Sequence, residues 1–566
     1  MGEGRRRFAG LIRSPRRLAR CVLPEGARRV FRDSWPRRWA SLRFRNALVL
    51  RPRLRRQLSW AAVPVATPPS QARVLLPLIQ TSHYQYYQVL ALAKALQLRG
   101  AAVRILICDS TLDGCELKNS RRRDRDPCLT CRHNARDLVG LFGLDVVLLS
   151  DLITDTQTPR LREYAANLAS EYPPEHEYKG VEIIRMTNES VVRHYYGSVP
   201  STGSPDLRSV RERYLYSALV GVDVAENQHR EWAPTALMND MAVYADWAPY
   251  TQYFAQRGIP YNLVSMAPFD LSAVMLNYEE LYSGTERFER WRSTRETRPL
   301  GEIEQRELNA FVAERFSAGG GFEQTLEWFG GDARHLLSQI DRSKRNVFLF
   351  SNLTWDVGIN YDGALYEDVI AWVLDSVRVL AEHPGTHLYV KTHPEESYGS
   401  AHSERGVEAA IREHFGELPS NVTIIPPELK IRPYDLFQFI DLGVVYNSTI
   451  GLEMMLKDIP VVVAGKAPYG GHGLSTEPRT TAEYADVLRG RVEPARADPR
   501  LIELYAYFYF IKSQIPWRLT KQVYFDDFSG FAFDRLDDLL PGKDPYLDHL
   551  CRCILEPERT VVEAWT

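Results

Sequence analysis

From residue 346 onward the chain alternates short apolar runs with stretches of helical periodicity, and this alternation limits the fold more than any other feature. Five runs consist mostly of Val, Ile, Leu, Phe and Tyr: NVFLFSN at 346–352, THLYVKT, NVTIIPP, DLGVVYN and IPVVVAG. A strand that is apolar without alternation needs cover on both faces, as in a parallel sheet between helices. We therefore expect a Rossmann-like α/β domain over residues 336–500.

The first half of the chain shows the same alternation. VLLPLIQ, HYQYYQVLALAKALQLRG and AAVRILIC predict a β-α-β unit, and further strand candidates lie at 145–150, 235–240 and 260–266. These elements predict a second Rossmann-like domain at 71–335, which ends in a charged, helical connector. The aromatic stretch at 501–566 predicts a helical segment that packs across both domains. A length of 566 residues fits this organisation.

Residues 1–70 are predicted to form a basic extension and linker. Residues 1–57 contain 18 Arg, no Lys and three acids, so this segment carries a net charge of +15 and the remainder carries −17. Apolar residues such as Phe8, Leu11 and Ile12 recur at helical spacing among the arginines. This pattern favours contact with an anionic membrane surface, and a solvated tail is the alternative. No groove-reading motif is present, so we expect no nucleic-acid partner.

The expected location follows from the absence of long apolar segments. The sequence contains no run of about 18 apolar residues, and its Arg-rich start lacks the uninterrupted apolar core of a secretory signal. We therefore expect a cytoplasmic protein, which the basic extension would hold at the inner face of the membrane.

Three of the seven cysteines follow a spacing that suits a metal ion. They form the pattern Cys115-x12-Cys128-x2-Cys131, with His133 two residues further on and Cys108 upstream. Thiolates two residues apart suit tetrahedral zinc. A second pair of this spacing is absent, so an iron–sulfur site and free thiols are the alternatives. The pattern predicts a structural zinc, and we expect no cofactor to be required for catalysis.

Polar residues follow the predicted strands of the second domain. In an open parallel sheet the ligand lies beyond the carboxyl ends of the strands, where helix N-termini attract phosphate. Lys391 and His393 follow one strand as cations or hydrogen-bond donors, and Pro394 biases His393 toward an extended conformation. Polar and acidic residues also begin the helix after another strand: Asn447, Ser448, Thr449 and Glu453. Each motif alone could be structural, but together they predict a phosphate site.

The motifs NLTWD, KTHPEE, VVYNSTIGLEMMLKDIPVVVAGKAPYGGHGLS and AYFYFIKSQIPW span about residues 346–530. In this order they resemble the bacterial capsule polysaccharide biosynthesis family, whose members include the Kdo transferases that build capsule linkers. The His-Pro and Ser/Thr pattern is also similar to bacterial sialyltransferases and to teichoic acid polymerases that use CDP-glycerol. The resemblance implies a GT-B-like fold: two Rossmann-like domains face a central cleft, with the donor in the C-terminal domain and the acceptor in the N-terminal one.

The resemblance also implies roles for particular residues. Binding of the donor phosphate is implied for His393, Ser448 and Thr449, and in second place for Lys391, Asn447 and Glu453. Glu453 could instead be a carboxylate on the helix surface. The turn after PLIQ is similar to the first strand-loop-helix of GT-B enzymes, so His83 would deprotonate an acceptor hydroxyl. A histidine that faces solvent is the alternative, and Asp240 is the rival base or an acceptor-binding group.

The implied activity is transfer of a sugar from a nucleotide-activated donor, CMP-Kdo-like in particular, to a bacterial surface or capsular polysaccharide or its lipid-linked precursor. We expect metal-independent chemistry because no Asp-x-Asp pair stands at a predicted strand end. Three alternatives stay open: a polyol-phosphate transferase that uses a CDP-alcohol, a nucleotide-sugar epimerase, and a non-catalytic component of capsule assembly or export.

Overall fold

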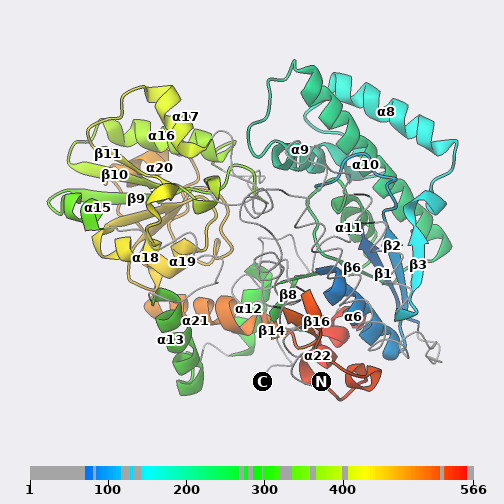
Figure 1. Ribbon diagram of the computed structural model, residues 1–566. Helices are drawn as coiled ribbons and strands as arrows, with labels where there is room; N and C mark the ends of the chain where they lie inside the picture. Colours follow the sequence, from blue (N-terminus) through cyan, green and yellow to red (C-terminus); the bar gives the residue numbers. More distant parts are fainter. Residues whose placement is uncertain are drawn as a thin grey trace, which may run out of the picture.

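Two α/β domains lie side by side in the computed structural model, with α12 (Thr285–Thr294) and α21 (Pro499–Tyr507) between them (Figure 1). Residues 1–70, with the predicted membrane contact, and His83 lie outside the part of the chain that the structure describes. The described residues are 71–80, 85–116, 128, 131, 142–266, 273–277, 285–295, 298–317, 334–356, 365–397, 406–522 and 528–556.

The second domain contains a parallel sheet of five strands in the order β11-β10-β9-β12-β13. Each predicted apolar run forms one strand: β9 (Arg345–Phe350), β10 (Thr386–Lys391), β11 (Val422–Ile425), β12 (Leu442–Val445) and β13 (Val461–Val463). Phe350 pairs with both Lys391 and Val445, so β9, β10 and β12 end at one edge. The strand order reverses between β9 and β12, which makes this pair the topological switch point of the sheet.

Helices cover both faces of this sheet, as the apolar runs required. One face packs on α16 (Val369–Ala381), α17 (Val407–Phe415) and α20 (Thr481–Leu488). The other face packs on α18 (Pro433–Leu436), α19 (Ile450–Met455) and α21. Capping fixes where these helices begin. The carboxylate of Asp368, for example, accepts the Ala371 N–H at 2.7 Å before α16.

The first domain contains a sheet of seven strands in the order β14-β8-β7-β6-β1-β2-β3. Five of them are parallel: β1 (Arg73–Leu78), β2 (Ala102–Ile107), β3 (Asp145–Leu148), β6 (Ala236–Asn239) and β7 (Tyr261–Met266). Here the order reverses between β1 and β6, so the first sheet has its own switch point. The structure thus confirms the predicted pair of Rossmann-like domains.

Two helical layers bury the first sheet. On one side lie α6 (Gln85–Leu98) and α22 (Pro545–Leu555). On the other side lie α8 (Gln157–Glu171), α9 (Ile183–His194), α10 (Pro205–Glu231) and α11 (Ala248–Ala255). The small hairpin β4 (Glu177–Tyr178) and β5 (Val181–Glu182) precedes α9. Among the described helices, none combines the length and the apolar character that a membrane span requires.

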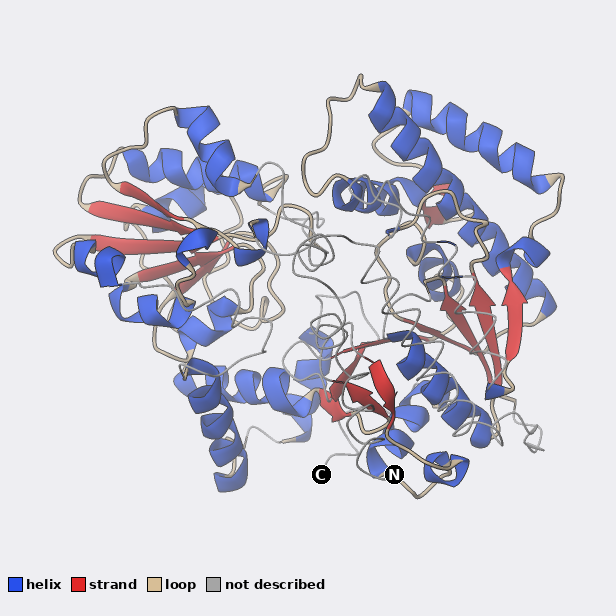
Figure 2. Ribbon diagram, in the orientation of Figure 1, coloured by secondary structure: helices blue, strands red, loops and turns tan. Residues whose placement is uncertain are grey.

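The segment expected to be helical after residue 500 also contributes strands. After α21 and a π-helical turn at Phe508–Lys512, β14 (Gln514–Pro516) pairs antiparallel with β8 (Ala273–Asn277) at the edge of the first sheet (Figure 2). A small antiparallel pair follows, β15 (Thr520–Gln522) and β16 (Phe528–Phe531), before α22. The connector holds α12, α13 (Glu302–Phe316) and α15 (Arg334–Gln339) in addition to β8.

The two domains touch where the end of α9 meets the loop after β9. Tyr196, Leu353 and Trp355 form a small buried cluster, and the Tyr196 and Trp355 rings meet edge to face with centroids 5.3 Å apart. Gly197 has a φ of +79°, and a Cβ added there would lie 2.1 Å from the Thr354 hydroxyl oxygen. Only glycine therefore allows this close approach between the domains.

Candidate functional site at the two switch points

The switch point of the second sheet joins two asparagines. Asn352 follows β9 and Asn447 follows β12, and the Asn352 side-chain amide donates a hydrogen bond to the Asn447 side-chain oxygen. Asn447 is buried and was predicted as a donor-binding residue, whereas Asn352 received no role from the sequence. Because ligands of open α/β sheets bind at such a reversal, this bond lies where a ligand is expected.

His393 follows β10, the strand next to β9. Its backbone N–H donates to the Ser351 hydroxyl at 3.1 Å, which ties the two strand ends together. The Glu395 N–H donates to the ring nitrogen Nδ1 at 3.2 Å, so the neutral ring carries its hydrogen on Nε2. Burial, with a smaller effect of Lys391, lowers the pKa of His393 to about 4. His393 is therefore a neutral hydrogen-bond donor rather than a cation at physiological pH.

Lys391 lies beneath this turn and is 4% exposed. Its ammonium group donates to the Thr392 carbonyl at 3.0 Å, and burial lowers its pKa to about 8 despite the nearby Glu396 and Glu428. The Glu396 carboxylate accepts the Val407 N–H at 3.0 Å, and burial raises its pKa to about 7. Lys391 thus belongs to a buried group of opposite charges that supports the turn of His393.

Ser448 and Thr449 stand at the start of α19 and are partly exposed. The Tyr469 hydroxyl donates to the Ser448 carbonyl at 3.0 Å from the glycine-rich loop after β13. A Cβ added to Gly451 would lie 1.9 Å from that hydroxyl oxygen, so glycine is required for this contact. The loop therefore fixes the backbone of the two hydroxyl residues next to Asn447.

Glu453, one turn further along, turns toward the connector. Its carboxylate accepts Arg315 Nε from α13 at 2.7 Å and the Tyr434 hydroxyl at 3.2 Å. The side chain is 3% exposed. These partners favour a structural role for Glu453, which locks α19 to the connector.

Asp240 follows β6, at the switch point of the first sheet. Burial, with a contribution from Glu116, raises its pKa to about 7. A second carboxylate, Asp246, lies in the same β6–α11 loop, and burial raises its pKa to about 7 as well. The Gln80 amide, which follows β1, donates to Asp246 Oδ2 at 3.0 Å. The residues after β1 and β6 therefore meet at this point.

A charged group that sequence reasoning missed links the two switch points. Arg193 on α9 donates to the Glu116 carboxylate at 2.9 Å, and its guanidinium lies 4.5 Å from the centre of the Trp355 ring in the second domain. Glu395 has a pKa raised to about 7 by burial and by Asp356, while Arg193 opposes the shift. The turn of His393 and the loop of Asp240 are thus connected through neighbouring charges.

Four cysteines of the predicted metal pattern and its surroundings, Cys108, Cys115, Cys128 and Cys131, lie within the described residues. Burial raises the pKa of Cys108 to about 11, and Cys128 and Cys131 act on it electrostatically, whereas the carbonyl of Cys115 accepts the Tyr214 hydroxyl at 3.3 Å. None of the four forms a disulfide bond among the described residues. No group of three or more His, Cys, Asp and Glu among the described residues is placed to hold a metal, and His133 lies outside them. A zinc ion at Cys115, Cys128 and Cys131 stays a prediction.

The geometry defines a class of protein: a two-domain α/β chain in which polar residues collect at the switch points of both sheets. Residues 330–515 match the model of the family described as Capsule polysaccharide biosynthesis protein. The match confirms the family resemblance of the motifs and covers the whole second sheet.

Curated relatives agree with this family. The chain is 29% identical over 170 residues to the capsule polysaccharide modification protein LipB of Neisseria meningitidis serogroup A, and equally to the serogroup B protein. The matched region covers 28% of this chain and 36% of each relative, so the chain spans about a third of their length.

The solved structures that resemble this chain share little sequence with it. The beta Kdo 2,4 transferase of Thermosulfurimonas dismutans KpsC is 16% identical with a TM-score of 0.32, and the match covers 49% of this chain and 79% of that one. The UDP-GlcNAc 2-epimerase of Neisseria meningitidis is 10% identical with a TM-score of 0.25, over 78% of this chain and 99% of that one. Scores this low identify no reaction, and the fold assignment comes from the two sheets themselves.

Proposed function

We propose that the protein is a glycosyltransferase of capsule polysaccharide biosynthesis, which moves a sugar from a nucleotide-activated donor to a glycan or glycolipid acceptor. The observation that carries this proposal is the convergence of Asn352, His393 and Asn447 at the switch point of the sheet that matches the family. The donor would bind there, and the acceptor would bind at the switch point of the first sheet.

The donor side suits a nucleotide phosphate. A neutral His393 presents an Nε2–H donor, and the start of α19 adds the hydroxyl groups of Ser448 and Thr449. Donors fixed before the reaction stabilise the negative charge that gathers on the phosphate as the glycosidic bond to it breaks. A CMP-Kdo-like donor is our choice because of the motif resemblance.

The acceptor side suits a general base. With a pKa of about 7, the Asp240 carboxyl can both accept and release a proton near neutral pH, which suits a general base that takes a proton from a hydroxyl. Asp240 would take this proton, the acceptor oxygen would attack the anomeric carbon, and the nucleotide would leave with the bonding electrons. No Asp-x-Asp pair stands at the end of a strand that the structure describes, so we include metal independence in the proposal.

The first experiment measures the melting temperature with CMP, CDP, UDP and GDP in parallel on the wild type, His393→Ala and His387→Ala. His387 is a matched control because it lies on the same strand but at the opposite end, where its Nε2 contacts the Thr423 hydroxyl at 2.8 Å. A ligand at about 100 times its dissociation constant adds about 2.7 kcal/mol to the stability of the native state. We expect a shift that His393→Ala loses and His387→Ala keeps.

Product analysis with CMP-Kdo and an acceptor glycan then separates the reactions. Transfer of the sugar with release of CMP supports the proposal, and persistence of turnover in EDTA supports the metal-independent form. Phosphorus in the product would identify a polyol-phosphate transferase, and consumption of the donor without acceptor would identify an epimerase. If no nucleotide changes the melting temperature, the proposal fails and a non-catalytic role in assembly or export becomes the better one.

The basic extension supplies the second part of the proposal. Residues 1–57 carry a net charge of +15, which suits an anionic membrane surface. Deletion of this segment should abolish binding to vesicles that contain phosphatidylglycerol while nucleotide binding remains. Equal binding by the full chain and the deletion variant would remove the membrane from the proposal.

A further inference from the structure

The β6–α11 loop carries two buried polar atoms that make no hydrogen bond among the described residues. They are Oδ1 of Asp246 and the hydroxyl of Tyr244, in side chains whose residues are 1% and 2% exposed. An unpaired buried polar atom costs about 1–3 kcal/mol, so a native chain retains one where something else satisfies it. Two such atoms in one short loop point to a common partner.

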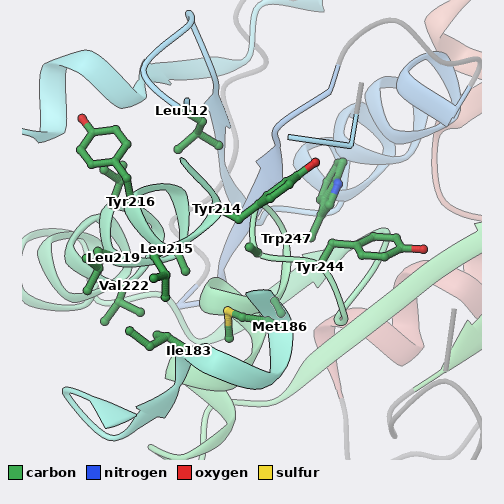
Figure 3. Close-up of a cluster of buried hydrophobic side chains, with 14 of the residues drawn as sticks. Leu112, Ile183, Met186, Tyr214, Leu215, Tyr216, Leu219, Val222, Tyr244 and Trp247 are labelled. Atoms are coloured by element: carbon green, nitrogen blue, oxygen red, sulfur yellow. The ribbon is translucent and has the colours of Figure 1, made fainter. Parts of the chain in front are cut away.

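The loop is held firmly, so the unpaired atoms do not reflect a loose segment. The Ala245 N–H donates to the Ser190 hydroxyl at 2.8 Å, and the Asn239 amide donates to the Trp247 carbonyl at 3.1 Å. Figure 3 shows Tyr244 beside Trp247, with its hydroxyl pointing away from the apolar side chains of the cluster. The Gln80 amide donates its hydrogen bond to Oδ2 of Asp246, so Oδ1 of the same carboxyl group has no hydrogen-bond partner among the described residues.

Asp246 and Tyr244 lie near the charged residues that connect the two domains. Burial raises the pKa of Tyr244, Arg193 opposes this shift, and Glu116 and Asp356 add to it. Asp356 belongs to the second domain, so the Tyr244 hydroxyl lies toward the interface between the domains. The Glu116 N–H lies 3.4 Å from Oδ2 of Asp246. Because Glu116 acts electrostatically on Tyr244, Asp246 and Asp240 alike, the two unpaired atoms belong to the loop in which the proposed function places the acceptor.

We propose that Asp246 and Tyr244 bind hydroxyl groups of the acceptor, and that the reacting end of the acceptor is an uncharged polyhydroxyl. This inference rests on the proposed function. A carboxylate accepts a hydrogen bond from a sugar hydroxyl, and a phenol can donate one to the next oxygen, so together they match adjacent hydroxyl groups. A site built this way rejects analogues that lack the hydroxyl.

The charge of the site sets the class of acceptor. Two carboxyl groups of the first domain, Asp240 and Asp246, each interact electrostatically with a third, Glu116, and Arg193 is already paired with Glu116. A carboxylate or phosphate on the reacting sugar would add a like charge beside them, which is unfavourable. Neutral hydroxyl groups avoid this repulsion and satisfy both unpaired atoms.

Tyr244→Phe gives the sharpest test because the lost hydroxyl has no partner within the described protein. We expect an unchanged or higher melting temperature and an unchanged nucleotide-induced shift. The affinity for neutral methyl glycosides of glucose, galactose and N-acetylglucosamine is measured by saturation-transfer NMR. It should fall about 3- to 10-fold, which is the effect of one hydrogen bond. Tyr250→Phe is the control, since its unpaired hydroxyl has Cys108 and Asp246 as electrostatic neighbours and lacks Arg193.

Asp246→Asn should lower the affinity for the same glycosides more strongly, about tenfold, because a charge-assisted hydrogen bond becomes a neutral one. In the wild type, methyl glucuronide and galacturonide should bind at least about fivefold more weakly than their neutral counterparts. Equal or tighter binding of the uronides, no binding of any neutral glycoside, or unchanged binding by both variants would overturn the inference. If the nucleotide-induced shift in melting temperature persists in these cases, only the proposed acceptor site is refuted, and the proposed function stands.

Discussion

The side-chain amide of Asn352 donates a hydrogen bond to the side-chain oxygen of Asn447, and this bond spans the two strands between which the second sheet reverses its order. Asn447→Ala should therefore lower nucleotide affinity, while the lost hydrogen bond lowers the free energy of unfolding by only about 1 kcal/mol. Nucleotide titration and urea unfolding measure the two effects separately. A loss of stability without any loss of affinity would place the donor elsewhere.

His393 should change the acid stability of the protein in a defined direction. Its pKa is about 4 in the folded chain, compared with about 6.5 in an unfolded one. The unfolded state therefore binds more protons between these values, so the wild type loses stability as the pH falls from about 6.5 to 4. His393→Asn lacks this contribution, and its stability should decline less over that range in urea unfolding at a series of pH values. Parallel curves for the two proteins would contradict the burial of a neutral imidazole.

Asp240 should set the acid limb of the rate profile near pH 7, the pKa that burial gives it. Asp240→Asn should lower kcat by about 10²- to 10⁴-fold while the nucleotide-induced melting shift remains. The folded carboxyl also holds its proton at a higher pH than the unfolded one, so it makes the wild type lose stability as the pH rises from about 4 to 7. The variant should lose less stability over that range, because only the contributions of groups such as Asp246, Glu395 and Glu396 remain. A variant that keeps full activity would leave His83 as the base.

Gly197 should control the contact between the domains. Gly197→Ala introduces both an unfavourable positive φ and an overlap with Thr354, whereas Gly258→Ala introduces only the first, because Gly258 has a φ of +70° and no atom near its added Cβ. Each substitution should destabilise its domain by about 1–2 kcal/mol. Only Gly197→Ala should enlarge the particle in small-angle scattering and slow turnover. Identical scattering from both variants would show that the domains meet without this contact.

Glu453 should prove structural. Glu453→Gln leaves Arg315 partly buried without its counter-charge, so we expect a loss of about 3 kcal/mol in the free energy of unfolding and nucleotide affinity within about twofold of the wild type. Arg378→Ala breaks an exposed pair with Asp375 and should change stability by less than about 1 kcal/mol. A large loss of affinity in Glu453→Gln would restore the donor-binding role implied by the family.

Parallel strands were predictable because their signal is local. β9 to β13 each bury two faces and so appear as continuous apolar runs, and the rule that ligands follow strand ends pointed to His393 and Asn447. β8 and β14 were missed because each is short and their pairing joins residues more than 230 positions apart. β14 also contains Pro516, which an edge strand tolerates but a local pattern does not indicate.

The missed site residues have a similar explanation. Arg193 lies inside an amphipathic helix, and nothing in its neighbouring sequence distinguishes it from a solvated arginine. Its role arises from Glu116, about 80 positions away, and from Trp355 in the other domain. Asp246 and Tyr244 were likewise invisible, because an unpaired atom is recognised only when its surroundings are known. The acid pair of KTHPEE gave the one local hint, since Glu395 follows directly on the His-Pro turn.

The antiparallel pairing of β14 with β8 also bears on how the chain is made. The second sheet, β9 to β13, is complete within residues 345–463, but the first sheet receives its edge strand only when residue 516 has been synthesised, and its core includes side chains from residues 515–554. Domains generally fold as units during synthesis, in order from the N-terminus. In this chain the second domain can therefore complete its fold first. The sheet of the first domain stays incompletely covered by helices until α22 has been synthesised.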